Sequence, residues 1–184
     1  TAQEMNKLFF EIVIAPSYNF DALEVLKQKK NRIILEQKKT EGGQSYKYRS
    51  LLNGVLTEQK NTSIQAVSDL KVVTNTAPSA TETEDLLFAN KMVKHLKSNA
   101  IALVKNKQLI GIGTGQTSRV DALNQSIDKA KQMGFSLDGA VMASDAFIPM
   151  TDTLEYAAKH QVQAIIQPAG SIKDQVVIER AEEL

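Results

Sequence analysis

Apolar and polar positions follow two different periods along the first part of the chain. Residues 11–15 (EIVIA) are a short apolar run that Pro16 ends, which is typical of a buried strand. Residues 20–30 instead place their apolar side chains at helical spacing. With a further helix expected at residues 3–10 and a further strand at 33–35, this part of the chain predicts an alternating αβαβ segment.

Residues 40–63 follow a different pattern. Tyr46 and Tyr48 alternate with polar residues, and the dipeptide Asn53-Gly54 is a strong signal for a tight turn between two strands. We therefore expect a surface hairpin or a pair of edge strands. The basic residues of this segment are explained more simply as a solvated strand face than as a nucleic-acid patch.

From residue 79 onward, longer helical patterns lie between short apolar strands. Ser79 and Glu82 match the capping box that opens a helix, which we expect at residues 82–96. A hairpin followed by β-α-β-α-β units predicts a mixed sheet whose last strands are parallel, with helices packed on it in three layers. The elements expected after this helix are a strand at 100–104, a turn at Asn106 and Lys107, a strand at 108–112, a helix at 120–133, a strand at 140–143, a helix at 153–160, a strand at 164–166 and a helix at 174–183.

A polar segment with proline, residues 74–80, separates these two patterns. We expect residues 1–75 to form a smaller αβ segment with an edge hairpin, and residues 76–184 to form the main α/β unit. Because the last predicted helix runs up to the final residue, Leu184, we also expect the chain to be cut from a longer protein at both ends.

Composition narrows the classes of function. The formal net charge of +1 provides no overall field for nucleic acid or an anionic membrane. The absence of cysteine excludes disulfides, thiolate catalysis and thiolate-bound zinc. The two histidines, His95 and His160, lack metal-ligand spacing, so we expect no metal site. No apolar run is long enough to cross a membrane and no signal peptide is apparent, so a cytoplasmic protein is expected.

Polar segments follow three of the predicted strands. Ser144 and Asp145 follow the strand at 140–143, residues 167–171 follow the next strand, and residues 113–119 follow the strand at 108–112. In open parallel sheets, ligands bind outside the carboxyl ends of the strands. The glycines of 113–119 and an arginine at the start of a helix would favour an anion such as phosphate. The sequence therefore predicts a small-molecule site at this edge.

Each of these residues also has a purely structural explanation. The Ser-Asp pair at 144–145 suits a helix N-cap as well as a hydrogen-bonding bracket of the loop. Phe147 alone is better explained as a core residue, and Asn99 would ordinarily be a turn residue. Arg119 could pair with Asp121 or with a helix on the surface.

A dinucleotide-binding oxidoreductase is a further alternative, because Gly111, Gly113 and Gly115 approach the dinucleotide fingerprint. Gln116 breaks that pattern, and the preceding strand belongs to a hairpin. A nicotinamide site is therefore disfavoured.

Four ordered motifs stand in the second half of the chain: KSNAI at 97–101, GIGTGQTSRVD at 111–121, ASDAFIP at 143–149 and IIQPAGSIKD at 165–174. In order and spacing they resemble the transformylase part of the bifunctional purine biosynthesis enzymes, in which 5-aminoimidazole-4-carboxamide ribonucleotide (AICAR) formyltransferase is joined to inosinate (IMP) cyclohydrolase. The likeness extends to residues 11–16 and 85–89 and so covers nearly the whole chain.

The resemblance implies transfer of a formyl group from 10-formyltetrahydrofolate, as cosubstrate, to the 5-amino group of AICAR. It also implies that the second unit is a three-layer cytidine-deaminase-like domain with a mixed sheet, and that the protein is a homodimer. No metal is required, because the zinc ligands of deaminases include cysteines that this chain lacks.

Residue by residue, the resemblance makes Asn99 the catalytic asparagine, whose amide would hold the formyl oxygen as charge develops. Arg119 and Phe147 match contacts to the nucleotide, together with Asn99. The residues that match folate contacts are Val120, Asp152, Ser171 and Ile172.

Two departures limit this assignment. The catalytic Lys-His pair of the family lies upstream of this segment, and the Lys94-His95 pair falls on a predicted helix in another context. The usual second aromatic of the Phe-Phe-Pro motif is Ile148 here. We therefore expect the chain to be inactive alone, and a non-catalytic ligand-binding or dimerisation module of the same fold remains the alternative.

Overall fold

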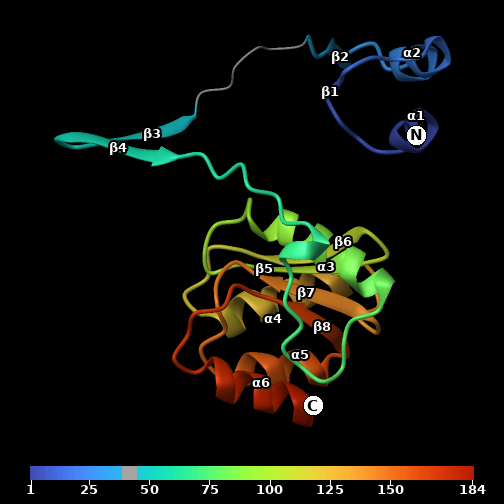
Figure 1. The fold of residues 1–184 in the computed structure, drawn as a ribbon. Helices are drawn as coiled ribbons and strands as arrows, with labels where there is room; N and C mark the ends of the chain where they lie inside the picture. The colour runs from blue at the N-terminus through green and yellow to red at the C-terminus, as the bar shows by residue number, and fades with distance from the viewer. Residues whose placement is uncertain (39–44) are drawn as a thin grey trace. The chain divides into compact units, whose positions relative to one another are not determined.

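The computed structural model describes residues 1–38 and 45–184, which form two compact units, Thr1–Thr62 and Ser63–Leu184 (Figure 1). Residues 63–75 thus pack with the second unit. The domain division expected after residue 75 stays a prediction about the organisation of the protein. No helix in the described part of the chain is long and apolar enough to cross a membrane.

The first unit begins with the expected αβαβ order. Its elements are α1 (Ala2–Met5), β1 (Ile12–Ala15), α2 (Phe20–Lys27) and β2 (Ile33–Glu36), and β1 pairs with β2 in parallel. The helix expected at 3–10 is wrong beyond Met5. Asn6 donates its side-chain amide to Gln28 and accepts a hydrogen bond from Arg32 at 3.0 Å. These contacts hold the chain at Asn6, where it leaves the helix.

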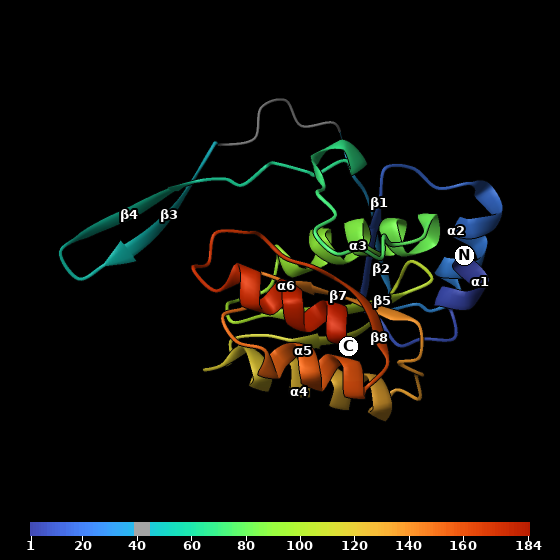
Figure 2. The ribbon, with the colours of Figure 1, turned by 60° about the horizontal axis from the view of Figure 1, so that its bottom comes forward.

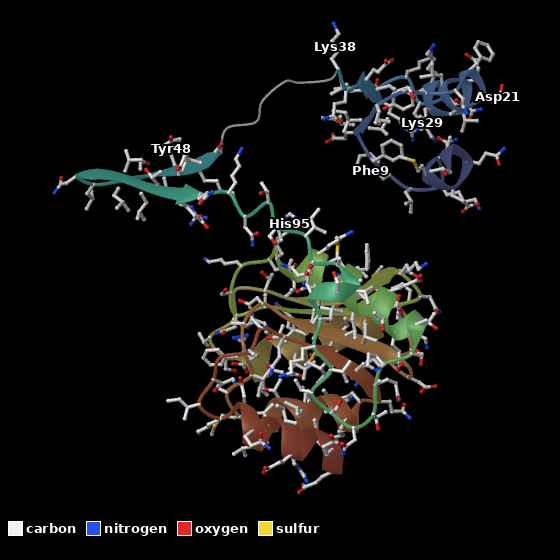
Figure 3. The ribbon with its side chains drawn as sticks, viewed as in Figure 1. Phe9, Asp21, Lys29, Lys38, Tyr48 and His95 are labelled. Carbon is white, nitrogen blue, oxygen red and sulfur yellow. The ribbon has the colours of Figure 1, made fainter. Side chains whose placement is uncertain are left out.

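The expected hairpin is confirmed as β3 (Tyr46–Leu51) and β4 (Gly54–Gln59), which are antiparallel. Leu52 and Asn53 form its two-residue turn, so Gly54 begins the second strand and lies one position outside the turn. Tyr48 projects from β3 (Figure 3), and both strands are exposed along their whole length. The first residues of the predicted segment, 40–44, lie outside the described part of the chain.

The second unit is an α/β domain with a four-stranded mixed sheet in the order β6-β5-β7-β8. Strand β5 is antiparallel to both of its neighbours, and β7 is parallel to β8, as expected. The strands β6, β7 and β8 therefore point the same way. The elements of this unit are the 3-10 turn η1 (Val67–Asp69), α3 (Ala80–Val93), β5 (Ile101–Lys105), β6 (Gln108–Gly113), α4 (Arg119–Gln132), β7 (Ala140–Ser144), α5 (Asp152–Lys159), β8 (Val162–Ile166) and α6 (Asp174–Glu183).

Helices cover both faces of this sheet (Figure 2). Ile101 and Leu103 of β5 belong to a core cluster with residues of α4, α5 and α6. The alternate residues Ala102 and Val104 belong to a second cluster with α3. Because successive side chains of a strand point to opposite faces, one strand serves two apolar cores. The expected α/β architecture is confirmed, while the cytidine-deaminase-like fold stays a prediction.

Two glycines of β6 allow helix α4 to lie directly on the strand. A Cβ atom added at Gly113 would lie 1.7 Å from the carbonyl oxygen of Ala122, and one at Gly111 would lie 2.1 Å from that of Ser126. No side chain fits at such distances. These glycines therefore serve helix packing, which corrects the expectation that Gly113 lets the backbone approach a ligand.

Candidate functional site

The loops after β6, β7 and β8 meet at one edge of the sheet, because these three strands point the same way. We call this region, formed by residues 97–100, 113–120, 144–152 and 167–173, the carboxyl edge. Strand β5 begins here because it is antiparallel to its neighbours. The main-chain N–H of Ile148 donates to Oε1 of Gln167 at 2.6 Å, which joins the loops after β7 and β8.

Asp145 is the centre of the polar contacts at the carboxyl edge. Its Oδ1 accepts hydrogen bonds from the main-chain N–H of Ala100 at 2.8 Å and from Nη1 of Arg119 at 2.9 Å. Its Oδ2 accepts a hydrogen bond from the hydroxyl of Ser98. Of the two explanations left open for the Ser-Asp pair, the structure supports the loop bracket, since Thr151 is the N-cap of α5.

The alternative in which Arg119 pairs with Asp121 is wrong. Asp121 accepts from the hydroxyl of Ser118 at 2.7 Å, and its main-chain N–H donates to the same hydroxyl oxygen at 3.0 Å, so it is engaged in capping α4. Arg119 turns instead toward Asp145, and both side chains of this ion pair are only 10% exposed.

Arg119 keeps hydrogen-bonding capacity for a ligand. Its Nε is buried and has no partner within the described residues. A buried donor without a partner is costly, and in native structures such a group calls for an explanation. A bound anion or other acceptor at the carboxyl edge would satisfy it.

Asn99 lies in the bend before β5 and is held against the loop after β6. Its main-chain N–H donates to the carbonyl of Gln116 at 3.2 Å, and its carbonyl accepts from the N–H of Gln116 at 3.3 Å. The side-chain Nδ2 also donates to the Gln116 carbonyl, at 3.0 Å. An amide nitrogen carries two hydrogens, so one remains for a ligand.

The main-chain amides of the glycine-containing loop are occupied within the protein. Thr114 donates to Oε1 of Gln125 at 2.8 Å, and Gly115 donates to the carbonyl of Lys97 at 2.6 Å. The N–H of Gln116 is taken by Asn99. The main-chain N–H groups of Thr114, Gly115 and Gln116 are therefore not free to bind a phosphate. Arg119, at the start of α4, remains a candidate cation for an anion at this edge.

The loop after β7 displays Phe147 and buries its neighbour. Phe147 is 41% exposed, whereas Ile148 is fully buried in the core. The hydroxyl of Ser144 donates to the carbonyl of Ala146 at 2.7 Å, and Gln167 holds the N–H of Ile148. The explanation of Phe147 as a core residue is wrong, because Ile148 occupies that place.

The four residues matched to folate contacts lie at loops or helix starts on the same edge. Val120, half-buried, is in the first turn of α4, and exposed Asp152 begins α5. Oδ1 of Asp152 accepts the N–H of Thr153 at 2.7 Å, which leaves Oδ2 for a ligand. Ser171 is half-buried and Ile172 fully exposed in the loop before α6. Their roles stay predictions.

The histidines lie elsewhere in the fold. The Lys94-His95 pair lies in the turn after α3, which ends at Val93, so the expectation that the pair falls on the helix is wrong. Nζ of Lys94 donates to the carbonyl of Ser63 at 2.7 Å, and Figure 3 labels His95. His160 follows α5, where burial and the charges of Lys131 and Lys159 lower its pKa. Within residues 1–38 and 45–184, no group of three or more metal-ligating side chains lies together.

Three residues that hold the site residues in place at the carboxyl edge were assigned no function from the sequence. Ser98, Gln116 and Gln167 each hold another residue of the site, through the contacts described above. The only feature of the sequence that could have identified them is their position, because each lies next to a predicted strand or in the loop that follows one. Which partner each of them binds depends on the order of strands in the sheet.

Comparisons with known proteins show the family to which the chain is similar. The AICARFT/IMPCHase bienzyme family matches residues 1–129. The bifunctional purine biosynthesis protein PurH of Bacteroides thetaiotaomicron is 59% identical over 173 residues, which cover 94% of this chain and 34% of that protein. The PurH proteins of Acetivibrio thermocellus and Aquifex aeolicus are 48% and 46% identical, over 97% and 100% of the chain. The chain thus spans about a third of the length of the curated relatives it matches.

Proposed function

We propose, because the chain belongs to the AICARFT/IMPCHase bienzyme family, that its carboxyl edge forms part of an AICAR formyltransferase site. The observation that carries the proposal is the nearly buried Arg119, with an unpaired Nε, beside an asparagine held firmly by the neighbouring loop. Such an arrangement offers a cation for the nucleotide and an amide donor for the reacting group.

In the reaction proposed, the 5-amino nitrogen of AICAR attacks the formyl carbon of 10-formyltetrahydrofolate. A new C–N bond forms, the bond from N10 of the folate to the formyl carbon breaks, and a proton passes from the amine to N10. Negative charge develops on the formyl oxygen, where the remaining hydrogen on Nδ2 of Asn99 would stabilise it. The acid–base pair that moves the proton is assigned to residues outside this segment.

The remaining side chains bind and orient the two reactants. The exposed ring of Phe147 suits stacking against the imidazole of AICAR, and Arg119 suits an electron-rich group of the nucleotide. Oδ2 of Asp152 is an acceptor for the ring and amino N–H groups of a pterin, with Val120, Ser171 and Ile172 completing the folate side. The proposed reaction uses no metal.

The wider proposal is a cytidine-deaminase-like second unit in a cytoplasmic homodimer. The mixed sheet with helices on both faces supports the fold. The homodimer rests on the family resemblance, and the cytoplasmic location is the expectation drawn from the sequence. Because the acid–base pair lies elsewhere, we predict that the 184-residue chain alone does not transfer the formyl group.

Formyl transfer by the full-length gene product tests this function. The wild type is expected to consume 10-formyltetrahydrofolate only when AICAR is present. Asn99→Ala is expected to lower kcat about 100-fold or more with a smaller change in KM, because an oxyanion donor is lost. Asn90→Ala is the matched control, since Asn90 donates to Gln65 away from the carboxyl edge.

The outcomes separate the two candidate functions. An active wild type with an impaired Asn99→Ala variant supports the enzyme. A wild type that binds AICAR without transferring the formyl group would favour the non-catalytic binding module. An active Asn99→Ala variant would remove Asn99 from the catalytic role.

A further inference from the structure

One carboxylate connects the cation of the proposed site to the residues on both sides of Asn99. Asp145 accepts Nη1 of Arg119 and the main-chain N–H of Ala100 on the same oxygen, at 2.9 and 2.8 Å. Its other oxygen accepts the hydroxyl of Ser98. Since Ser98 and Ala100 flank Asn99, Asp145 fixes where the chain enters and leaves that residue.

The surroundings of Asp145 make this connection strong. Its side chain and that of Arg119 are each 10% exposed, so solvent and salt screen the pair much less than a surface pair. Hydrogen bonds between charged groups are also stronger than neutral ones. Removing one partner would leave the other charge nearly buried and uncompensated.

The backbone of Asp145 adds a further tie to the same segment. Its main-chain N–H donates to the carbonyl of Ala100 at 3.3 Å, which continues the pairing of β5 with β7 beyond Ile101 and Ser144. The carboxylate is therefore attached to the end of a buried strand. A side chain on such a rigid element places its partners more reproducibly than one on a free loop.

We propose that Asp145 is a positioning residue that sets the spacing between Arg119 and Asn99 for the formyl transfer. The inference rests on the proposed function. One side of the carboxylate acts through Arg119 on nucleotide binding. The other side acts through Ser98 and Ala100 on the orientation of the Asn99 amide. Asp145 itself needs no contact with either reactant.

Steady-state kinetics of the full-length gene product test this role, with AICAR as the varied substrate. Asp145→Asn keeps the size of the side chain but removes its charge and sets an amide against the Arg119 donor. We expect KM for AICAR to rise about tenfold and kcat to fall about tenfold. Near-ultraviolet circular dichroism should show a native fold.

Two further variants separate the two sides of the carboxylate. Arg119→Gln is expected to raise KM, and adding Asp145→Asn to it should raise KM no further, because the cation that Asp145 positions is already gone. Ser98→Ala leaves the ion pair intact and is expected to lower kcat at unchanged KM. This split in the kinetic parameters would not follow from a general loss of stability.

Asp121→Asn is the matched control. It removes one carboxylate charge from the first turn of α4, two residues from Arg119, without touching the ion pair. Its kinetic parameters are expected to equal those of the wild type.

The outcomes distinguish a failure of the role proposed for Asp145 from a failure of the proposed formyl transfer. An active wild type with an unaffected Asp145→Asn variant, or KM effects that multiply in the double variant, overturns the role of Asp145 and leaves the function standing. A wild type without formyl transfer overturns both. If Asp145→Asn does not fold, Ser98→Ala decides, and an unchanged kcat there overturns the inference.

Discussion

Asp85 of α3 holds the turn that joins β5 and β6. Its side chain is 5% exposed, and its two oxygens accept the main-chain N–H groups of Asn106 at 2.7 Å and Lys107 at 2.6 Å. Both turn residues have positive φ, 52° and 59°, as a tight turn between twisted strands requires. Asp85 therefore stabilises a backbone conformation that these residues adopt rarely.

Asp85→Ala is expected to lower the free energy of unfolding by about 2 kcal/mol, since two partly buried N–H groups lose a charged acceptor. Urea unfolding followed by circular dichroism measures the loss. Glu84→Ala is the control, because its ion pair with Lys107 is exposed and such pairs contribute little. Equal effects of the two variants would contradict the account.

The sequence placed Arg119, Asp145 and Phe147 in loops at the same end of the sheet, as the structure has them, but did not predict the contact between Arg119 and Asp145. Asp121 is the nearest acid to Arg119 along the chain, and the contact with Asp145 spans 26 residues. Only the order of strands in the sheet brings those two side chains together. Whether Phe147 or Ile148 enters the core likewise depends on Gln167, which belongs to another loop.

Helix α3 begins with the capping box that the sequence predicted. The N–H of Ser79 donates to the Glu82 carboxylate at 2.7 Å, and the N–H of Glu82 donates to the Ser79 hydroxyl at 3.2 Å. The hydrogen bonds with the side chain and the backbone of Ser79 lower the pKa of Glu82 from its ordinary 4.5. The ionised carboxylate is thus favoured by folding.

This lowered pKa predicts a pH dependence of stability. A carboxyl group whose folded pKa lies below its unfolded value stabilises the protein fully above about pH 4.5 and loses that contribution as pH falls through the folded value. Glu82→Gln should therefore be less stable than the wild type at pH 7, and this difference should be smaller at pH 3. Ser79→Ala should cost about 1 kcal/mol at neutral pH. Urea unfolding at both pH values would contradict this if the Glu82→Gln difference did not narrow in acid.

Helices and strands with a clear hydrophobic periodicity and with capping or breaking residues at their ends were predicted well. Helix α6 was expected at residues 174–183 and is found at Asp174–Glu183, and α3 was found within three residues of its expected bounds. The errors concern element ends that are determined by contacts or turn conformations that the local sequence pattern does not show. Helix α1 ends early because Asn6 binds Arg32, and β8 begins at Val162 because Gln161, with φ of 64°, already completes the turn.

The buried core of the described chain lies almost entirely in the second unit. Of the buried apolar residues, only Leu26 belongs to Thr1–Thr62. Residues 63–184 should therefore fold alone and unfold in one cooperative transition, with a urea midpoint close to that of the whole chain. A broad, non-cooperative transition of residues 63–184 would show that this unit depends on the first.

The family could be identified from the sequence because its motifs are local and ordered, and the comparisons confirm it. The site could be identified only as a set of positions. Its contacts depend on the order β6-β5-β7-β8, which places the start of β5 between the loops after β6 and β7. Hydrophobic periodicity predicts the strands but not which of them are neighbours.

The most direct test of the central claim is a calorimetric titration of the chain with AICAR, with and without a folate analogue. The account predicts saturable binding that weakens about tenfold or more in both Arg119→Ala and Phe147→Ala. Lys107→Ala, which removes a cation at the opposite end of β6, should bind as the wild type does. Wild-type binding that neither Arg119→Ala nor Phe147→Ala weakens would contradict the placement of the nucleotide at the carboxyl edge.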